Sequence, residues 1–334
     1  MNYDVYGLGN ALVDTEYEVD DAFLGKTPYP KGIMTLIEEE DRASLIRLLE
    51  DEHEHQVVKQ AGGGSAANTT VIVAQLGGRA FYSCKVASDP TGDFFIRDLD
   101  LAGVDTNLGP DREPGVTGEC ISMVTPDAER TMTTHLGITQ NLSAAELRPE
   151  VLKNSRYLYI EGYLVSSENG FAAALEAQRI AREAGVAVTL TLSDPAMVEN
   201  FRDQFGQLMD GGVDILFCNE EEARLWSGEA DRDAAAAVIA GQVGAYVITC
   251  GAGGALVADR GDAPALVPGV ATQPVDTTGA GDIFAGAFLY AIAGGAAFAQ
   301  AAVLANQAAS ILVASFGARL PIETVEAELH PLRQ

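Results

Sequence analysis

The chain has 334 residues, 47% of them hydrophobic, and a formal net charge of −27. The hydrophobic content is enough for a sizeable core, which excludes a disordered chain. The negative charge argues against nucleic-acid backbones and anionic membranes as partners, because both are polyanions.

The cysteines and the chain start predict a cytoplasmic protein. The four cysteines are scattered without a Cys-x-x-Cys pair, so we expect reduced thiols. The first residues reach acidic side chains quickly and lack the basic start of a secretory signal. The apolar stretch 283–299 comes closest to a membrane span, but its glycines and alanines favour a buried helix.

Short apolar segments alternate with helical ones along much of the chain. The predicted strands are Asp4–Leu8, Arg156–Glu161, Val186–Leu192, Val213–Cys218 and Tyr246–Cys250. Helical patterns lie between the later strands, at Phe171–Glu183 and Asp233–Gln242. A repeat of about 30 residues is the size of a βαβ unit. The sequence therefore predicts an α/β fold with a mostly parallel sheet covered on both faces.

Two segments interrupt this alternation. Residues 15–38 contain several glycines and prolines, and residues 111–139 alternate like strands around a turn signal at Pro126-Asp127. We interpret both as a small β-rich lid inserted into an α/β core formed by residues 1–14, 39–110 and 140–334. A pair of ordinary edge hairpins is the alternative.

The first chemical motif is Gly62-Gly63-Gly64, which precedes a predicted helix. Glycine lets a ligand approach the backbone closely, and the amide of Asn68 can reach a ligand hydroxyl. A flexible turn into a helix capped by Ser65 explains the same residues without a ligand.

Further along the chain, polar residues mark the lid and the end of a strand. Arg130 is the lone cation of its neighbourhood and can meet a phosphate when the lid closes, or remain a solvated hairpin residue. The run Asn219–Glu222 follows a predicted strand. Carboxylates suit Mg²⁺, so Asn219 and Glu222 are candidates to organise that ion. An acidic first helical turn, favoured by the helix dipole, is the alternative.

The strongest motif is the run 276–282, Asp-Thr-Thr-Gly-Ala-Gly-Asp, which leads into an apolar helix. The backbone N–H groups of Gly279, Ala280 and Gly281 would converge on an anion at the helix N-terminus. Asp282 lies at the same place, where it can act as a helix cap or take a proton from a hydroxyl group. Phosphoryl transfer requires such a carboxylate together with N–H donors around the developing charge.

The runs 62–69 and 276–289 resemble the two signatures of the ribokinase-like carbohydrate and nucleoside kinases, the PfkB family. The resemblance covers nearly the whole chain. It implies a three-layer α/β sandwich with a β-sheet lid, ATP as the phosphoryl donor and Asp282 as the base. It also implies that Asp14 accepts hydrogen bonds from the hydroxyls of a sugar, in one pocket with Gly63, Gly64 and Asn68.

The resemblance extends to the nucleotide and to metal ions. It implies that Asn219 and Glu222 organise Mg²⁺ through water. The residues that it places along the nucleotide are Thr249, Gly251, Gly254 and Asn306. For Asn306, a packing role is an equal alternative. A K⁺ ion is implied beside the carbonyl groups of Asp276, Thr278 and Gly317.

The acceptor is predicted from the N-terminal run 7–24 and from residues 213–228, which resemble adenosine kinases more than ribokinases or fructokinases. We predict transfer to the 5′-hydroxyl of a ribonucleoside, adenosine first, by a monomer or homodimer. Candidates for contacting the base are Tyr17, Phe23, Met132 and Leu136. A free-sugar kinase is the alternative, and a nucleoside-binding protein without catalysis is a more distant one, since it would have little use for Asp282.

Overall fold

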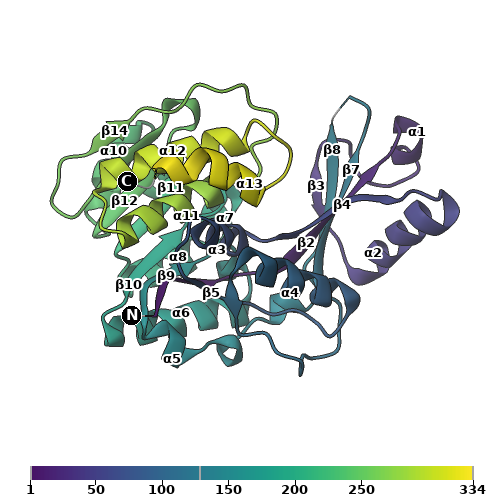
Figure 1. Cartoon of the computed structure of the whole chain (residues 1–334), viewed down its shortest axis with the longest axis horizontal. Coiled ribbons are helices and arrows are strands. Elements are labelled where there is room, and N and C mark those ends of the chain that lie inside the picture. The colour runs from purple at the N-terminus through teal and green to yellow at the C-terminus, as the bar shows by residue number, and fades with distance from the viewer. Residues whose placement is uncertain (1, 128, 333–334) are drawn as a thin grey trace.

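The computed structural model describes residues 2–127 and 129–332. Figure 1 shows a large α/β body and a smaller β-sheet that projects from it with two helices. Residue 128, within the predicted lid segment 111–139, lies outside the described residues. In the described part of the chain, no helix has both the length and the apolar character needed to span a membrane.

The body contains one large sheet with the strand order β14-β13-β12-β11-β10-β9-β1-β5-β6. Its strands are β1 Tyr3–Leu8, β5 Ala80–Ser83, β6 Asp105–Thr106, β9 Ser155–Ile160, β10 Ala187–Thr191, β11 Ile215–Asn219, β12 Ala245–Thr249, β13 Ala255–Ala258 and β14 Ala265–Val267. The pairs from β6 to β12 are parallel, and β13 and β14 extend the edge in antiparallel fashion. The predicted mostly parallel sheet is confirmed.

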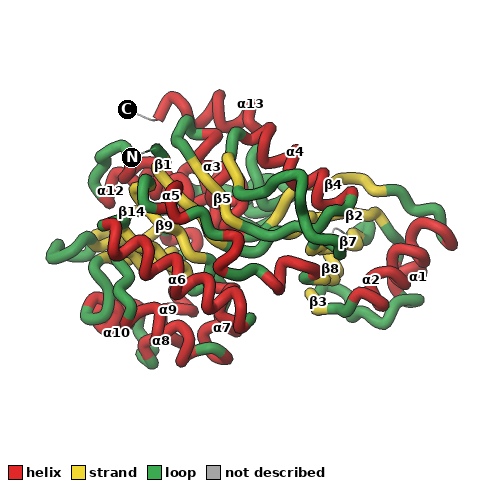
Figure 2. The backbone as a smooth tube through the Cα atoms, turned by 90° about the horizontal axis from the view of Figure 1, so that it is seen from below, coloured by secondary structure: helices red, strands yellow, loops and turns green. Residues whose placement is uncertain are grey.

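Helices cover both faces of this sheet, as Figure 2 shows from below. The first face is covered by α3 Ser65–Gln75, α4 Pro90–Ala102, α11 Ala280–Ala293 and α12 Phe298–Leu312. The second face is covered mainly by α6 Glu168–Ala184, α8 Arg202–Asp210, α9 Glu220–Ser227 and α10 Arg232–Ala240. Separate hydrophobic clusters fill the two interfaces. The predicted three-layer arrangement is therefore confirmed.

Shorter elements complete the body. The short α-helices are α5 Pro149–Leu152, α7 Pro195–Asn200 and α13 Ile322–Thr324. The 3₁₀ turns are η2 Gly137–Asn141, η3 Ala144–Glu146, η4 Gly162–Ser166, η5 Gly251–Gly253 and η7 His330–Leu332. A π-helical turn, η6, covers Val325–Leu329.

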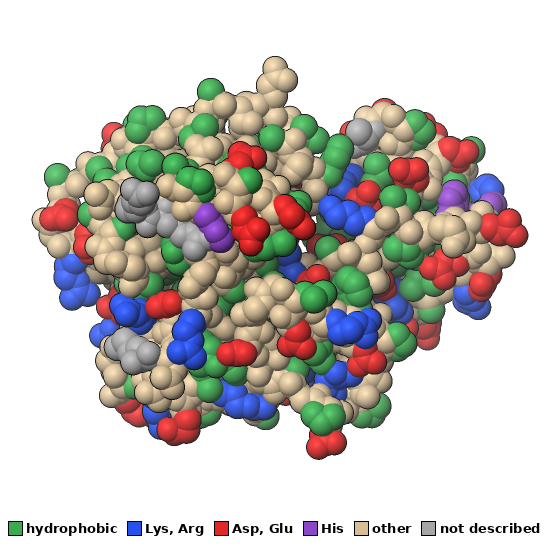
Figure 3. All heavy atoms as spheres, viewed as in Figure 1, with side chains coloured by type: hydrophobic (Ala, Val, Ile, Leu, Met, Phe, Trp, Pro, Cys, Tyr) green, Lys and Arg blue, Asp and Glu red, His purple; other side chains and the backbone are tan. Residues whose placement is uncertain are grey.

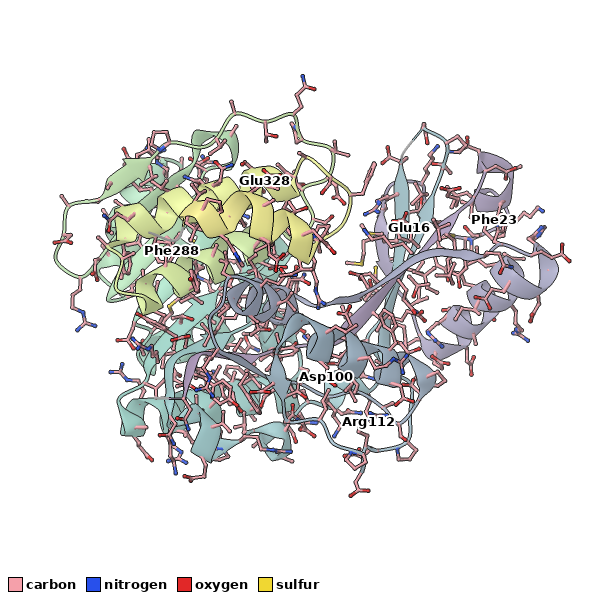
Figure 4. All side chains as sticks on the ribbon, viewed as in Figure 1. Glu16, Phe23, Asp100, Arg112, Phe288 and Glu328 are labelled. Atoms are coloured by element: carbon pink, nitrogen blue, oxygen red, sulfur yellow. The ribbon has the colours of Figure 1, made fainter. Side chains whose placement is uncertain are left out.

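Helix α11 is anchored in the body by aromatic packing. Phe288 is fully buried, and its ring lies edge-on to the rings of Phe217 and Phe298, at 5.7 and 5.0 Å between centroids (Figure 4). Truncating such a side chain to alanine typically costs about 3–5 kcal/mol. The apolar stretch 283–299 does not form one helix, because Gly294 and Gly295 end α11 before α12 begins. The packing fixes the direction in which the N-terminus of α11 points.

The small sheet has the strand order β3-β8-β7-β2-β4. Its strands are β2 Leu12–Glu18, β3 Met34–Leu36, β4 Val57–Gly63, β7 Gly118–Val124 and β8 Arg130–His135. Strands β7 and β8 are joined by a turn at Pro126 and Asp127, as predicted. Strand β4 lies within 39–110, the range assigned to the core, so the small sheet draws on more of the chain than segments 15–38 and 111–139.

The outer side of the small sheet has its own covering layer. It consists of α1 Asp21–Leu24, α2 Glu39–Ile46 and the π-helical turn η1 Arg47–Glu52. Tyr17 and Phe23 are each 3% exposed in the hydrophobic cluster beneath this layer. Figure 4 shows Phe23 on the far side of the sheet and Glu16 on the side nearer the body. Tyr17 and Phe23 therefore cannot contact a nucleobase in the cleft, contrary to expectation.

Candidate active site

A cleft of about 720 Å³ lies between the body and the small sheet. Figure 3 shows the corresponding hollow between the two parts of the surface. The small sheet contributes Asp14, Met34, Leu36, Cys120 and Thr134 to its walls. The body contributes the segment 277–282 and the carboxyl ends of β9, β10, β11 and β12. This agrees with the general position of ligand sites at the carboxyl ends of parallel strands.

Asp282 lies in the first turn of α11 and faces this cleft. The hydroxyl of Ser65 donates to its Oδ1 at 2.6 Å, and Nδ2 of Asn68 donates to its Oδ2 at 3.0 Å. Burial raises the pKa of Asp282 to about 6, while these two donors lower it. The carboxylate is thus largely ionised at neutral pH and held in one orientation.

The two predicted motifs meet at this carboxylate. Gly64 is the N-cap of α3, and Gly279 is the N-cap of α11. Ser65 and Asp282 are therefore not helix caps, which was the alternative interpretation of each residue. Their side chains bond to each other across 217 positions of sequence.

Asp14, on β2, lies against the glycine run of β4. A Cβ atom on Gly63 would be 2.6 Å from Oδ2 of Asp14, which is closer than real Cβ contacts. Gly64 has φ = +100°, and a Cβ there would meet the carbonyl oxygen of Asn10 at 2.2 Å. Gly64 therefore excludes a side chain, and a side chain at Gly63 would displace the Asp14 carboxylate. Burial raises the pKa of Asp14 to about 6, while Arg319, Arg130 and Lys59 lower it.

Glu161 is a site residue that the sequence interpretation missed. It follows β9, is 1% exposed and lines the cleft. Its carboxylate accepts hydrogen bonds from the backbone N and the Nδ2 of Asn10, at 3.2 and 3.0 Å, and from the N of Ala66 at 2.9 Å. Burial raises the pKa of Glu161 to about 7 despite these donors. Its place at the carboxyl end of a predicted strand was a signal that could have identified it.

The N-terminus of α11 opens onto the cleft, and Gly279, Ala280 and Gly281 all line it. Gly279 adopts φ = +76°, which turns the chain into the helix. The amide of Ala280 already donates to the carbonyl of Thr277 at 3.2 Å. The helix dipole and the remaining amides of the first turn favour an anion here.

Asp276 links the anion site to the small sheet. Its Oδ2 accepts from Nη1 of Arg130 and from the amide of Gly317, both at 3.0 Å, and its Oδ1 accepts from the amide of Thr278 at 2.9 Å. Burial opposes ionisation, but these donors hold the pKa of Asp276 below its usual range. The three residues predicted beside K⁺ are thus brought together.

Arg130 is not a solvated hairpin residue. It forms ion pairs with Glu16 and Asp276, and its guanidinium lies 5.2 Å from the ring centre of Phe316. It therefore joins β8 of the small sheet to two loops of the body. Arg130 is not among the residues that line the cleft.

Asn219 and Glu222 form a capping box at the start of α9. The amide of Glu222 donates to Oδ1 of Asn219 at 2.8 Å, and the Glu222 carboxylate accepts from the backbone N and the Nδ2 of Asn219, at 3.0 and 2.6 Å. Both residues line the cleft, and burial raises the pKa of Glu222 to about 7. Asn219 and Glu222 therefore stabilise the start of α9, as the alternative interpretation expects, and Glu222 also lines the cleft.

A magnesium site made of protein ligands alone is not present in the described part of the chain, where no three Asp, Glu, His or Cys side chains converge. Magnesium usually keeps several waters and takes one or two carboxylates together with substrate phosphates. Glu222 and Asn219 fit that description as the residues that would hold the ion, directly or through water.

The remaining predicted nucleotide residues divide into two groups. Thr249, at the end of β12, lines the cleft. Gly251 and Gly254 shape the turn that follows, in which the amide of Gly254 donates to the carbonyl of Gly251 at 3.1 Å. Asn306 donates to the carbonyl groups of Val267 and Pro268 at 3.2 and 3.0 Å. Gly251, Gly254 and Asn306 do not line the cleft.

Arg319 was also missed. Its Nε donates to Oδ1 of Asn68 at 2.8 Å, and its Nη1 contacts the carboxylate of Asp98. It lies in the loop after α12, two residues after Gly317, and belongs to none of the motifs that the sequence shows.

Comparison with known proteins agrees with this geometry. The model of the pfkB family carbohydrate kinases matches residues 33–325. The chain therefore belongs to the pfkB family of carbohydrate kinases. Mouse ribokinase is 32% identical over 230 residues, which covers 67% of this chain and 68% of that protein.

Two solved bacterial structures are similar along nearly the whole chain. A probable sugar kinase from Rhizobium etli is 34% identical with a TM-score of 0.86 and covers 99% of both chains. Adenosine kinase from Sinorhizobium meliloti is 36% identical with a TM-score of 0.85 and covers 98% of this chain and 99% of that one. The likeness extends to sugar and nucleoside kinases alike, so it supports phosphotransferase activity without defining the acceptor.

Proposed function

We propose that this kinase transfers the γ-phosphoryl group of ATP to the 5′-hydroxyl of a ribonucleoside, adenosine first. The observation that carries the proposal is the Asp282 carboxylate, ionised and oriented by Ser65 and Asn68 at the N-terminus of α11. The family membership supports ATP as the donor.

In the proposed reaction, Asp282 takes the proton of the acceptor hydroxyl. The acceptor oxygen forms a bond to the γ-phosphorus while the bond from that phosphorus to the β,γ-bridging oxygen breaks, and ADP leaves. The first turn of α11 binds the transferred group through Gly279, Ala280 and Gly281, where its charge is stabilised. Glu222 and Asn219 would hold magnesium, which would neutralise charge on the phosphates.

The walls of the cleft support a nucleoside acceptor. Asp14 lines the cleft beside the glycine run, where its carboxylate can accept hydrogen bonds from vicinal hydroxyls. Leu36, Leu136, Tyr163 and Phe201 supply apolar and aromatic surface in the same cleft. Such surface suits a nucleobase, and a free sugar has no nucleobase to contact it. The likeness to the adenosine kinase of Sinorhizobium meliloti also supports a nucleoside acceptor.

A free-sugar kinase is the second candidate, and Glu161 favours it. This buried carboxylate adds a second acidic group to the cleft. Asn10 and Ala66 already donate three hydrogen bonds to it, which leaves about one acceptor position for a hydroxyl. The likeness to the Rhizobium etli sugar kinase and to mouse ribokinase also supports it.

We also propose the lid division and the ion requirements that the sequence predicts. Segments 15–38 and 111–139, together with β4, would close over the acceptor. Arg130 would then leave Asp276 and form an ion pair with a phosphate. A K⁺ ion would bind carbonyl groups of Asp276, Thr278 and Gly317. A cytoplasmic monomer or homodimer is part of the same proposal.

An ADP-release screen tests the proposed function. Adenosine, inosine, guanosine, ribose and fructose are each offered with ATP, with and without Mg²⁺ and K⁺. We expect the largest kcat/KM with adenosine, dependence on Mg²⁺ and stimulation by K⁺. A preference for ribose or fructose would support the sugar kinase instead. ADP release with none of the five, by enzyme shown to bind ATP, would contradict both candidates.

A further inference from the structure

A line of polar contacts runs from the loop after α12 to the carboxylate of Asp282. Nε of Arg319 donates to Oδ1 of Asn68 at 2.8 Å. Nδ2 of the same Asn68 amide donates to Oδ2 of Asp282 at 3.0 Å. Arg319 thus lies one side chain away from the base, although it does not line the cleft.

The Arg319 contact determines which way the Asn68 amide faces. A carboxamide has an acceptor end and a donor end, whereas a guanidinium only donates and an ionised carboxylate only accepts. With Arg319 on one side and Asp282 on the other, only one orientation satisfies both neighbours. Without the guanidinium, the carboxylate alone selects this orientation, so the amide and the Asp282 carboxylate that it holds are less firmly fixed.

The guanidinium is itself held firmly in place. Its Nη1 contacts the Asp98 carboxylate on α4, and the Arg319 side chain is 12% exposed. A Cβ atom on Gly62 would lie 2.4 Å from Oδ2 of Asp98 and 3.0 Å from Nη1 of Arg319. Gly62 is therefore needed to leave room for this ion pair. The first glycine of the 62–64 run supports the network, whereas Gly63 makes room for Asp14.

We propose that Arg319 is a positioning residue for phosphoryl transfer, which acts through Asn68 to keep the Asp282 carboxylate oriented and ionised. The inference rests on the proposed role of Asp282 as the base.

The charges around Asp282 make the expected effect on its titration clear. The titratable groups that face it from neighbouring elements are Asp14, Tyr82, Tyr159, Glu161, Tyr163 and Arg319. Arg319 is the cation of this set, and it lowers the pKa that burial and Asp14 raise. Loss of Arg319 should raise the pKa of Asp282, so that the base becomes protonated at higher pH.

The test compares Arg319→Gln with the wild-type enzyme across pH, with adenosine or whichever acceptor the screen selects. We expect kcat at pH 7 to fall roughly ten- to hundredfold, as is typical when a catalytic group is misplaced. The acid limb of the kcat profile should move to higher pH, while KM for ATP stays nearly unchanged. A merely structural role would not move the acid limb.

Two further variants separate charge from geometry. Arg319→Lys keeps the charge but not the planar donor, so its acid limb should lie close to that of wild type while kcat stays low. Arg97→Gln is the matched control, because Arg97 is an exposed cation on α4 next to Asp98. Its acid limb should match the wild type. An equal displacement in Arg97→Gln would overturn the inference.

A double-mutant cycle tests the route through Asn68. In an Asn68→Ala background, Arg319→Gln should have little further effect on kcat, because the link is already removed. Equal effects in both backgrounds would refute the inference. If Arg319→Gln does not fold, the same measurements use Arg319→Gln/Asp98→Asn, which leaves no unpaired charge.

The outcome distinguishes this inference from the proposed function. If Asp282→Asn keeps wild-type turnover, the role of the base itself fails. If Asp282→Asn is inactive while Arg319→Gln keeps the wild-type rate and pH profile, only the role of Arg319 fails.

Discussion

The two ends of the cleft are built in different ways. At the acceptor end, side chains from distant segments bond to one another: Ser65 and Asn68 to Asp282, and Glu161 to the loop that contains Asn10. At the proposed nucleotide end, which Asn219, Glu222 and Thr249 line, the capping box of α9 is a local contact.

This difference indicates which end has been organised before a ligand arrives. The proposed acceptor end already holds its carboxylates in fixed positions, which would lower the cost of reaching the transition state. The nucleotide end offers helix starts and a turn, and leaves much of the phosphate recognition to backbone groups and to magnesium. Changes at the acceptor end should therefore affect chemistry or acceptor binding, and changes at the nucleotide end should affect ATP affinity or stability.

The largest effect is expected for Asp282→Asn. The substitution keeps the shape of the side chain but removes the base, so kcat should fall by at least ~100-fold. ATP affinity, measured by calorimetry, should stay close to that of the wild type. Turnover near the wild-type rate would remove Asp282 from the mechanism and with it the contrast between the two ends.

A smaller loss is expected for Asp14→Ala. Removing a carboxylate that accepts bonds from hydroxyls should weaken acceptor binding by about 1.5–3 kcal/mol. ATP binding should change far less, and Glu18→Gln, at an exposed position on the same strand, should change neither. Equal losses for acceptor and ATP in calorimetry would point to misfolding instead of a lost contact.

The pH dependence of kcat/KM sharpens the same comparison. The base must be ionised to accept a proton, and the pKa of Asp282 is raised to about 6. The rate should therefore be constant above that pH and fall about tenfold per pH unit well below it. A profile in the free enzyme without an acid limb between pH 5 and pH 7 would contradict this assignment.

The smallest effect is expected for Asn306→Ala, at a residue that is predicted to contact the nucleotide but does not line the cleft. The side chain holds the chain after β14 to α12 through two carbonyl groups. Losing these bonds should lower the free energy of unfolding by about 1–3 kcal/mol, measured by urea denaturation. KM for ATP should change little. A large rise in KM for ATP with unchanged stability would support the adenine contact implied by the family resemblance.

Much of the body was predictable from the sequence because its signals are local. Continuous apolar strands at regular spacing predicted the parallel sheet, and the glycines before an apolar segment predicted the start of the helix at Asp282. The covering layer of the small sheet was not foreseen. Its helix α2 carries few apolar residues, and Tyr17 and Phe23 looked equally suited to a ligand or to a core.

The parts of the site that escaped prediction depend on contacts between distant segments. In the sequence, Ser65 enters only as the helix cap of the ligand-free alternative, and only the fold brings Asp282 to its hydroxyl. Glu161 follows a predicted strand and was within reach of the rule for strand ends. Arg319 is an ordinary loop residue in the sequence. Its proposed role depends on its hydrogen bond to Asn68, which is 251 positions away.

The most direct test of the proposed reaction is the phosphorus NMR spectrum of the product formed from ATP, Mg²⁺ and adenosine. The matched control is 5′-deoxyadenosine, which lacks only the hydroxyl that is expected to attack. We predict a 5′-monophosphate from adenosine and no nucleotide product from the control. Phosphorylation of 5′-deoxyadenosine, or a product of adenosine phosphorylated at the 2′ or 3′ position, would contradict the account.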